Sequence, residues 1–337
     1  MSNDNTNQLK NKINKAYLKG GGQLPKKTGV LAYMKEFLLE QGVPEKLLKE
    51  LEEFRNFYKL DDNLKDRIPT PKYKYYGGEV LSKSIAALLA GYNILLSGPK
   101  ATGKNVLAEN LGMLFGRPMW NISMNVTSDS SSLLGTDTFV DNEVKLRKGP
   151  VYNAAESGGF AVFDEINMAK NDSLSVIYSA LDYRRVIDVP GYEKINMHDA
   201  TRFIGTMNYG YIGTKELNEA LVSRFLVIEM PTITEENFKM ILNDEFNLKD
   251  EYLDTFVRLF MDLQKKSLNA EISSKAIDLR GLFSSIETIK RGLSIKSALE
   301  MGIVNKTFDQ YEKDIVRDVI NSLIKDSVKP EDIFIGK

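Results

Sequence analysis

A glycine-rich segment from Gly98 to Asn105 holds the residues best suited to chemistry in this sequence. It reads Gly-Pro-Lys-Ala-Thr-Gly-Lys-Asn and fits the spacing G-x-x-x-x-G-K. Glycines let such a loop turn tightly and present successive backbone N–H groups to phosphate oxygens, and Lys104 adds a mobile positive charge. A glycine-rich turn without a ligand is the alternative interpretation. The residues expected to contact a bound nucleotide are Gly98, Pro99, Lys100, Ala101, Thr102, Gly103, Lys104, Asn105 and Val106.

Asn105 stands where a loop of this kind usually has serine or threonine, whose hydroxyl ligates magnesium. An amide oxygen is also a suitable ligand for a hard divalent cation. It lies one atom further from the backbone, so we expect Asn105 to bind Mg²⁺ but to alter magnesium affinity or turnover. A site that binds nucleotide without hydrolysing it is the extreme case.

Two carboxylates, Asp164 and Glu165, follow the apolar run Phe160–Phe163. We expect Asp164 to hold the magnesium shell and Glu165 to polarise an attacking water. The alternative is a buried strand whose acidic end only favours the start of the next helix. Because the pair follows a phosphate loop along the chain, the sequence favours the catalytic interpretation.

Two further polar residues end apolar segments. Asn208 follows the run Phe203–Met207 and is placed to hydrogen-bond the lytic water or the γ-phosphate, although asparagines after strands are more often turn residues. Arg224 closes the segment Leu217–Phe225, where a lone arginine is normally a solvated charge or a helix cap. Its catalytic interpretation is an arginine finger.

Strands and helices alternate around these residues. Strands are predicted at 93–97, 118–124, 160–164, 202–206 and 225–230, with helices at 79–90, 104–115, 169–181 and 214–224. This alternation predicts a mostly parallel sheet covered on both faces. Amphipathic patterns at 234–246, 249–266, 273–291, 295–304 and 308–325 predict a helical bundle after Pro231. Before the sheet, two helical patterns follow a polar, lysine-rich arm over residues 1–27.

Composition excludes several classes of function. The 337 residues contain no cysteine and one histidine, which excludes disulfides, thiolate chemistry and multi-histidine metal sites and fits a reducing cytoplasm. The net charge of −1 argues against non-specific attraction to nucleic acid. No secretory signal and no membrane-spanning run are visible. We therefore expect a cytoplasmic protein.

The chain resembles the AAA+ superfamily, and within it the MoxR branch with its CbbQ/NirQ/NorQ relatives, related to the dynein-type modules. The resemblance rests on Gly98–Asn105, on Phe160–Asn167 and on Gly205–Phe225, which is similar to the family's T-M-N-P…G-T…L-N-E-A-L…R-F. It implies an α/β P-loop core with a five-stranded parallel sheet flanked by helices, a C-terminal all-α lid and an N-terminal helical extension. The implied domains are residues 1–70, 71–231 and 232–337.

The resemblance also implies roles and cofactors. ATP and Mg²⁺ are the expected ligands, Asn208 would be the first sensor, and Arg224 the finger that reaches the ATP of an adjacent subunit in a ring, usually a hexamer. The second sensor would be Lys275 or Arg280, Gly149-Pro150 would open a helix, and inserts at 134–146 and 185–195 would face the pore or a partner. The family's proline after the sensor asparagine is replaced by Tyr209.

Three functions follow as hypotheses. The first is an ATP-driven remodelling chaperone of the MoxR/CbbQ type that acts on a client protein, often through a partner with a von Willebrand A domain. The second is an ATP-binding switch or scaffold that hydrolyses little. The third is a nucleic-acid motor resembling the McrB-type subunits, for which the arm supplies basic residues: Lys10, Lys12, Lys15, Lys19, Lys26 and Lys27.

Overall fold

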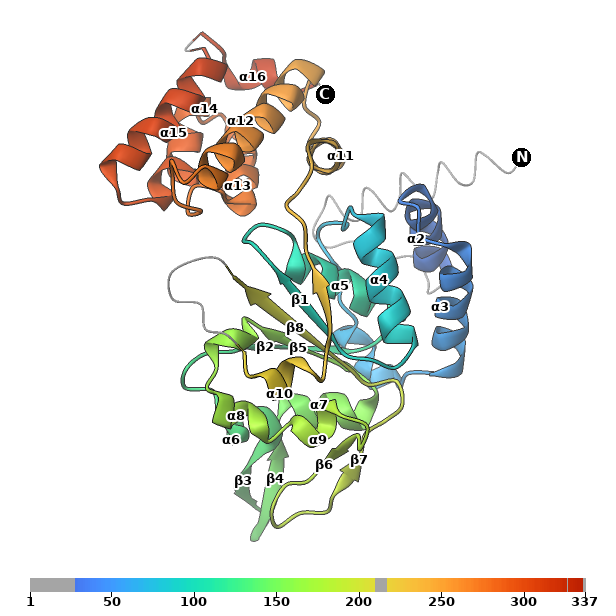
Figure 1. The fold of residues 1–337 in the computed structure, drawn as a ribbon. Helices are drawn as coiled ribbons and strands as arrows, with labels where there is room; N and C mark the ends of the chain where they lie inside the picture. Colours follow the sequence, from blue (N-terminus) through green and yellow to red (C-terminus); the bar gives the residue numbers. More distant parts are fainter. Residues whose placement is uncertain (1–27, 210–216, 326, 336–337) are drawn as a thin grey trace, which may run out of the picture. The chain divides into compact units, whose positions relative to one another are not determined.

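The computed structural model describes residues 28–209, 217–325 and 327–335 (Figure 1). The chain divides into two compact units. The first ends at Pro231, and the second comprises the residues from Thr232 on together with Lys100–Thr102. The lysine-rich arm expected over residues 1–27 lies outside the described residues, and so does the start of the helix expected at 214–224.

A five-stranded parallel sheet forms the centre of the first unit, with the strand order β2-β5-β8-β1-β9. Its strands are β1 (Ile94–Gly98), β2 (Met119–Ser123), β5 (Phe160–Asp164), β8 (Arg202–Asn208) and β9 (Leu226–Glu229). Side chains alternate between the two faces, so Ile94 and Leu96 join one apolar cluster and Leu95 joins the other. The predicted α/β core with a five-stranded parallel sheet is confirmed.

Helices cover both faces of this sheet (Figure 1). One face carries α2 (Thr28–Glu40), α3 (Glu45–Phe57), α4 (Gly78–Leu89) and α5 (Lys104–Phe115). The other face carries the shorter helices α6 (Ser130–Leu134), α7 (Pro150–Ser157), α8 (Asn171–Ser175), α9 (Tyr178–Leu181) and α10 (Glu219–Val222). Gly149 caps α7 and Pro150 opens it, a position where the missing N–H of proline costs no hydrogen bond.

The N-terminal helical extension shares the core of the sheet domain. The ring of Phe54 in α3 lies 5.1 Å from the ring of Phe115 in α5. Arg55 Nη1 donates to the carbonyl oxygens of Met113 and Leu114, each at 2.8 Å, and so caps the C-terminal end of α5. A cation at this end also complements the helix dipole. The helix that follows the phosphate loop is therefore fixed at its far end by the extension.

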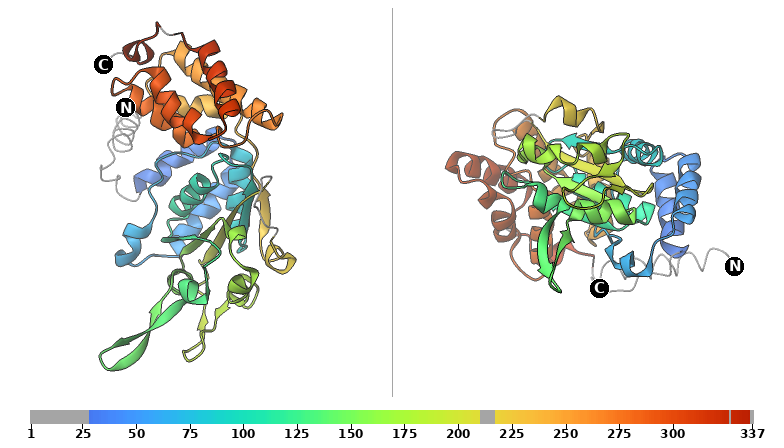
Figure 2. Two further views of the ribbon diagram at one scale, coloured as in Figure 1. Left: turned by 90° about the vertical axis from the view of Figure 1, so that its left-hand side faces the viewer. Right: turned by 90° about the horizontal axis from the view of Figure 1, so that it is seen from below.

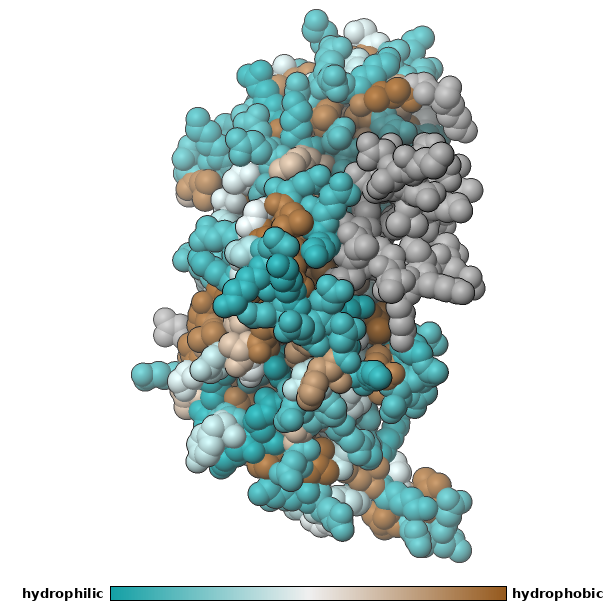
Figure 3. All heavy atoms as spheres, turned by 90° about the vertical axis from the view of Figure 1, so that its right-hand side faces the viewer, coloured by the Kyte–Doolittle hydropathy of each residue, from teal (hydrophilic) through white to brown (hydrophobic). Residues whose placement is uncertain are grey.

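Two hairpins project from the first unit, and Figure 2 shows the larger one clearly. It pairs β3 (Gly135–Val140) with β4 (Glu143–Lys148) through a turn in which Asp141 and Asn142 both have positive φ, as a tight two-residue turn requires. Brown, hydrophobic atoms are visible on this projection in Figure 3. The smaller hairpin pairs β6 (Val186–Ile187) with β7 (Ile195–Asn196), and its Tyr192 hydroxyl donates to Asp137 Oδ1 at 2.7 Å.

The second unit is a bundle of helices. They are α11 (Glu235–Glu245), α12 (Asp250–Leu268), α13 (Leu279–Ile289), α14 (Ile295–Gly302), α15 (Gln310–Leu323) and α16 (Pro330–Ile333). An isolated antiparallel bridge joins Leu248 to Phe334. Within the described ranges, the helices are all too short or too polar to cross a membrane.

Three helix predictions were wrong in extent. The segment expected at 169–181 forms two short helices, α8 and α9, with Val176 and Ile177 between them. The helix expected at 273–291 begins at Leu279, since Ser273 instead bonds the carboxylate of Glu312 through its N–H and hydroxyl. In the described part of 214–224 the helix is confined to α10 and begins after Asn218, whose side chain accepts the Ala220 N–H.

Candidate functional site

The phosphate loop joins the end of β1 to the start of α5. At Gly98 an added Cβ would lie 2.6 Å from the carbonyl oxygen of Met230, so the neighbouring backbone leaves no room for a side chain. Gly103 has φ +80 and caps α5, a backbone conformation that favours glycine. The loop therefore leads directly into a helix N-terminus, whose free N–H groups bind anions.

Lys104 lies at that helix start and is buried against the loop. Its Nζ donates to the carbonyl oxygens of Gly98 at 2.9 Å and Pro99 at 2.6 Å. Burial lowers the pKa of Lys104 to about 8, while the charges of Asp164 and Glu165 act in the opposite direction. A buried ammonium held by loop carbonyls is ready to exchange them for phosphate oxygens, which carry full negative charge.

The carboxyl ends of β5 and β8 bring the two carboxylates to the predicted sensor. Thr206 Oγ1 donates to Asp164 Oδ1 at 2.7 Å and accepts the Glu165 N–H at 3.1 Å. Asn208 Nδ2 donates to Glu165 Oε1 at 3.2 Å. The neighbouring Asn167 Nδ2 in turn donates to the Asn208 carbonyl oxygen at 3.2 Å. Each carboxylate is thus oriented by a separate donor on β8.

Glu165 adopts the left-handed region, with φ 54, directly after β5. This conformation is uncommon for a residue with a side chain, and such positions gather at functional sites. The Thr206 hydroxyl and the Asn208 amide hold the residue on both its backbone and its side chain. The strained turn is therefore fixed by two hydrogen bonds.

Asn105 meets Asp164 across the loop, with its Nδ2 donating to Asp164 Oδ2 at 3.0 Å. Both are half-buried, in the first turn of α5 and at the end of β5. Carboxylate and amide oxygens are the donors that Mg²⁺ accepts, so the chemistry of this pair fits the predicted metal. Asp164 still has lone pairs available, because each carboxylate oxygen accepts only one of the two hydrogen bonds described.

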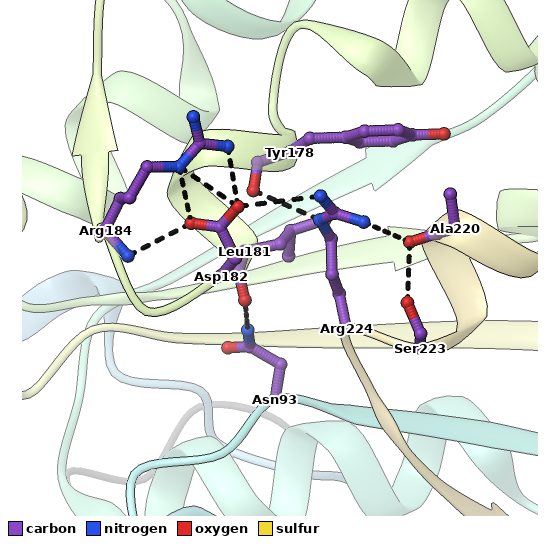
Figure 4. Close-up of polar contacts among 8 residues, drawn as sticks. All are labelled: Asn93, Tyr178, Leu181, Asp182, Arg184, Ala220, Ser223 and Arg224. Carbon is purple, nitrogen blue, oxygen red and sulfur yellow. Dashed lines mark hydrogen bonds and ion pairs between the residues drawn. The ribbon is translucent and has the colours of Figure 1, made fainter.

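Arg224 lies at the other end of the sheet from the loop of its own chain. It comes two residues before β9, and Leu226 pairs with Ile94 at the start of β1, whereas the loop follows Gly98 at the end of β1. Figure 4 shows its guanidinium beside the ring of Tyr178, whose centroid is 4.5 Å away. The structure therefore does not bring Arg224 to the phosphate loop of the same chain.

The remaining predicted residues fall in two places. Pro99, Lys100, Ala101 and Thr102 form the loop, and Val106 packs against the core from the first turn of α5. Lys275 and Arg280 belong to the second unit, both exposed, the first before α13 and the second in its first turn. A role for either as the second sensor stays a prediction.

Two residues of this region were missed in the sequence. Thr206 lies two residues before Asn208 on β8, and the alternation of a strand puts such residues on the same face, a signal that was available. Tyr75 is buried, and its ring lies 3.3 Å from the position a Cβ on Gly103 would take. Nothing in the local sequence around Tyr75 marks it as a neighbour of the loop.

The comparisons with known proteins cover this whole region. A family model of AAA domains of the dynein-related subfamily matches residues 93–225, from just before β1 to the residue after Arg224. The Uncharacterized protein YojN of Bacillus subtilis (strain 168) is 33% identical over 299 residues, which cover 87% of this chain and 96% of that protein. An uncharacterized protein of Staphylococcus epidermidis is 33% identical over 257 residues, 74% of this chain and 97% of its own length.

Proposed function

Since the chain belongs to the AAA+ ATPases of the dynein-related, MoxR-like branch, we propose that it hydrolyses ATP with magnesium to remodel or activate a partner protein. The observation that carries this proposal is the set of hydrogen bonds from Thr206 and Asn208 to Asp164 and Glu165, beside the phosphate loop. A fold that only bound nucleotide would have no need to orient a second carboxylate in a strained turn.

Each residue has a distinct task in this mechanism. Bound Mg-ATP supplies the phosphoanhydride bond that is broken and the divalent charge on its phosphates. Lys104 would exchange its carbonyl partners for phosphate oxygens, and Asp164 with Asn105 would hold the magnesium ion. Glu165 accepts a proton from the attacking water, and Asn208 keeps the Glu165 carboxylate in place.

A ring of subunits is part of the proposal. Arg224 lies at the sheet end opposite its own loop, so an arginine finger at this position would act on the nucleotide of an adjacent subunit. A hexamer is the form expected from the family. The two projecting hairpins, joined by the Tyr192–Asp137 hydrogen bond, would then be the parts that meet the client or a von Willebrand A partner.

A second function is favoured by one observation. The amide of Asn105 is hydrogen-bonded to Asp164, where the usual hydroxyl would be both smaller and closer to the backbone. If this arrangement weakens metal binding, the chain would act as an ATP-dependent assembly switch or scaffold with weak hydrolysis. The nucleic-acid hypothesis depends on lysines of residues 1–27, which lie outside the described residues.

Magnesium-dependent ATPase measurements test the proposal. Wild-type turnover should exceed that of Glu165→Gln by about a hundredfold or more, the scale of general base catalysis, while both bind ATP equally. Turnover at the level of Glu165→Gln in an assembled wild-type ring would favour the switch. The proteins that copurify with Glu165→Gln, which should hold both ATP and client, would identify the partner.

Mixed rings test the action of the finger in trans. Glu165→Gln and Arg224→Ala should each be inactive alone. An equal mixture should regain activity, because a site with an intact Glu165 can then face a neighbour with an intact Arg224. A mixture that stays inactive, although it assembles, would contradict the interfacial site.

A further inference from the structure

Asp182, just after α9, is shared between two arginines (Figure 4). Its carboxylate accepts from Arg184 Nε at 3.0 and 3.2 Å and from Arg184 Nη2 at 2.7 Å. On the other side, Arg224 Nη2 lies 3.6 Å from Asp182 Oδ2. The proposed finger therefore has a negatively charged neighbour in its own chain, and that neighbour already has a closer partner.

The two arginines are held unequally. Arg184 meets Asp182 with a bidentate fork and also donates its backbone N–H to Oδ1 at 3.0 Å, geometry typical of strong charge-assisted bonds. The 3.6 Å approach of Arg224 is longer than a hydrogen bond and leaves a weak ion pair. The Arg184 side chain is 50% exposed, against 22% for that of Arg224.

The remaining contacts of Arg224 are to neutral groups. Its Nε donates to the Tyr178 carbonyl oxygen at 3.4 Å, and its Nη1 donates to the Ala220 carbonyl oxygen, which also accepts the Ser223 hydroxyl at 3.0 Å. These carbonyl oxygens belong to α9 and α10. Because they are neutral, they would not compete with a phosphate for the guanidinium. Among the contacts of Arg224 described above, Asp182 is the one negatively charged group, so it decides how firmly the finger is held.

Asp182 itself cannot move away easily. The buried Asn93 donates through Nδ2 to the carbonyl oxygen of Leu181 at 3.0 Å, and its Oδ1 accepts the Phe203 N–H of β8 at 3.0 Å. Asn93 thus ties the residue before Asp182 to the central sheet. A carboxylate fixed in this way will pair with the arginine that can form two hydrogen bonds to it.

We infer that Arg184 is a positioning residue for Arg224. Arg184 occupies the carboxylate of Asp182, and Arg224 is therefore left free to reach the nucleotide of a neighbouring subunit. The inference rests on the proposed role of Arg224 as a finger. When Arg184 is removed, Asp182 can turn its full carboxylate to Arg224 and form the bidentate pair that Arg184 now forms. The finger must then break that pair before each turnover.

The test compares turnover in assembled rings at saturating ATP. Arg184→Ala should lower kcat by about ten- to a hundredfold, the range for one additional hydrogen bond to a charged group, and leave ATP affinity unchanged. Asp182→Asn added to Arg184→Ala should restore kcat, because an amide cannot hold the finger. Arg184→Lys should fall between wild type and Arg184→Ala, because lysine keeps the charge but loses the fork.

Two controls separate the possible failures. Arg258→Ala removes an exposed arginine of α12 whose Nε lies 3.9 Å from Asp262, and it should leave kcat unchanged. If Arg224→Ala keeps full activity, the proposed finger itself is wrong. If Arg224→Ala is inactive but Arg184→Ala equals wild type, or the double variant stays as slow as Arg184→Ala, the positioning role alone is overturned.

Discussion

Asn105 Nδ2 donates a hydrogen bond of 3.0 Å to Asp164 Oδ2, which links the first turn of the helix after the phosphate loop to the end of the acidic strand. In the proposed site both residues contribute to the magnesium shell. The amide nitrogen faces the carboxylate, so the amide oxygen is the atom left for the metal. Variants at this position can therefore separate metal binding from nucleotide binding.

Asn105→Leu should weaken ATP binding only when magnesium is present. Leucine has the same branching at Cγ but offers no oxygen to the metal, and Asp164 also loses one donor. We expect the affinity for Mg-ATP to fall about tenfold, a loss near 1.4 kcal/mol, with little change for ATP in EDTA. Titration of a fluorescent ATP analogue with and without Mg²⁺ measures this. Asn105→Thr supplies the usual hydroxyl and should bind ATP more tightly with Mg²⁺ than without it, as wild type does. If Asn105→Leu lost the same affinity with and without Mg²⁺, the role of Asn105 as a metal ligand would be contradicted.

Nucleotide affinity should decrease above pH 8 because of Lys104. Burial lowers its pKa from 10.5 to about 8, so above that value the free protein increasingly holds a neutral amine. Phosphate binds the ammonium, and affinity should therefore fall toward tenfold for each further pH unit. Calorimetric titration between pH 7 and 9.5 would record the slope. Lys104→Met should bind nucleotide weakly, and its affinity should not change with pH in this window. If the affinities of both proteins fell equally with pH, a group other than Lys104 would be responsible.

The same shift fixes the sign of a stability effect. Between about pH 8 and 10.5 the unfolded chain binds more protons at this lysine than the folded chain does. The contribution of Lys104 to the free energy of unfolding should therefore increase as pH rises through that window, and it should be at its least favourable below pH 8. Denaturant unfolding of wild type and Lys104→Met at pH 7 and 9.5 gives this difference directly.

Thr206→Val should impair hydrolysis more than nucleotide binding. Valine keeps the shape of threonine but removes the donor to Asp164 and the acceptor of the Glu165 N–H. We expect kcat to fall more than about tenfold and the free energy of unfolding to fall by about 1–3 kcal/mol. Thr206→Ser retains the hydroxyl and should remain close to wild type. Single-turnover kinetics would refute the assignment if valine and serine behaved alike.

Arg117→Met should destabilise the first unit strongly. The Arg117 side chain is almost fully buried and donates to the carbonyl oxygens of Tyr58, Ser157 and Gly158. Methionine leaves these acceptors without a donor, and we expect a loss of about 3–5 kcal/mol in urea unfolding. The same substitution at the exposed Arg147 should change stability by less than about 0.5 kcal/mol. Similar losses at both positions would rule out the carbonyl contacts as the cause.

Much of the sheet could be predicted from local sequence, because most of its strands contain an apolar run bounded by polar residues or glycine. The five strands lie where their patterns indicated, and the loop and the acidic pair have recognisable spacing. The order of the strands could not be read locally, since β1 pairs with β8 and β9, which come more than a hundred residues later. The predicted helix limits were wrong where a residue hydrogen-bonds another that is distant in sequence, as Ser273 does with Glu312.

The candidate site divides in the same way. Lys104, Asp164 and Glu165 were predictable because a motif fixes their types and spacing. The surroundings of Arg224 were not, because Asp182 and Tyr178 become its neighbours only when α9 packs beside α10. Tyr75 shows the same limit, since it lies beside the phosphate loop only in the folded chain. Thr206 differs, because its position two residues before Asn208 on one strand was a usable signal.

At Glu165, the left-handed backbone conformation sets the stability of the fold against the proposed chemistry. A side chain in this region destabilises the fold by roughly 1 kcal/mol relative to glycine, and asparagine also tolerates it better. Glycine or asparagine at this position would therefore stabilise the turn but would remove the carboxylate that the proposed mechanism uses. Glutamate at position 165 therefore reduces the stability of the turn, and the proposed hydrolysis gives a reason for a carboxylate there.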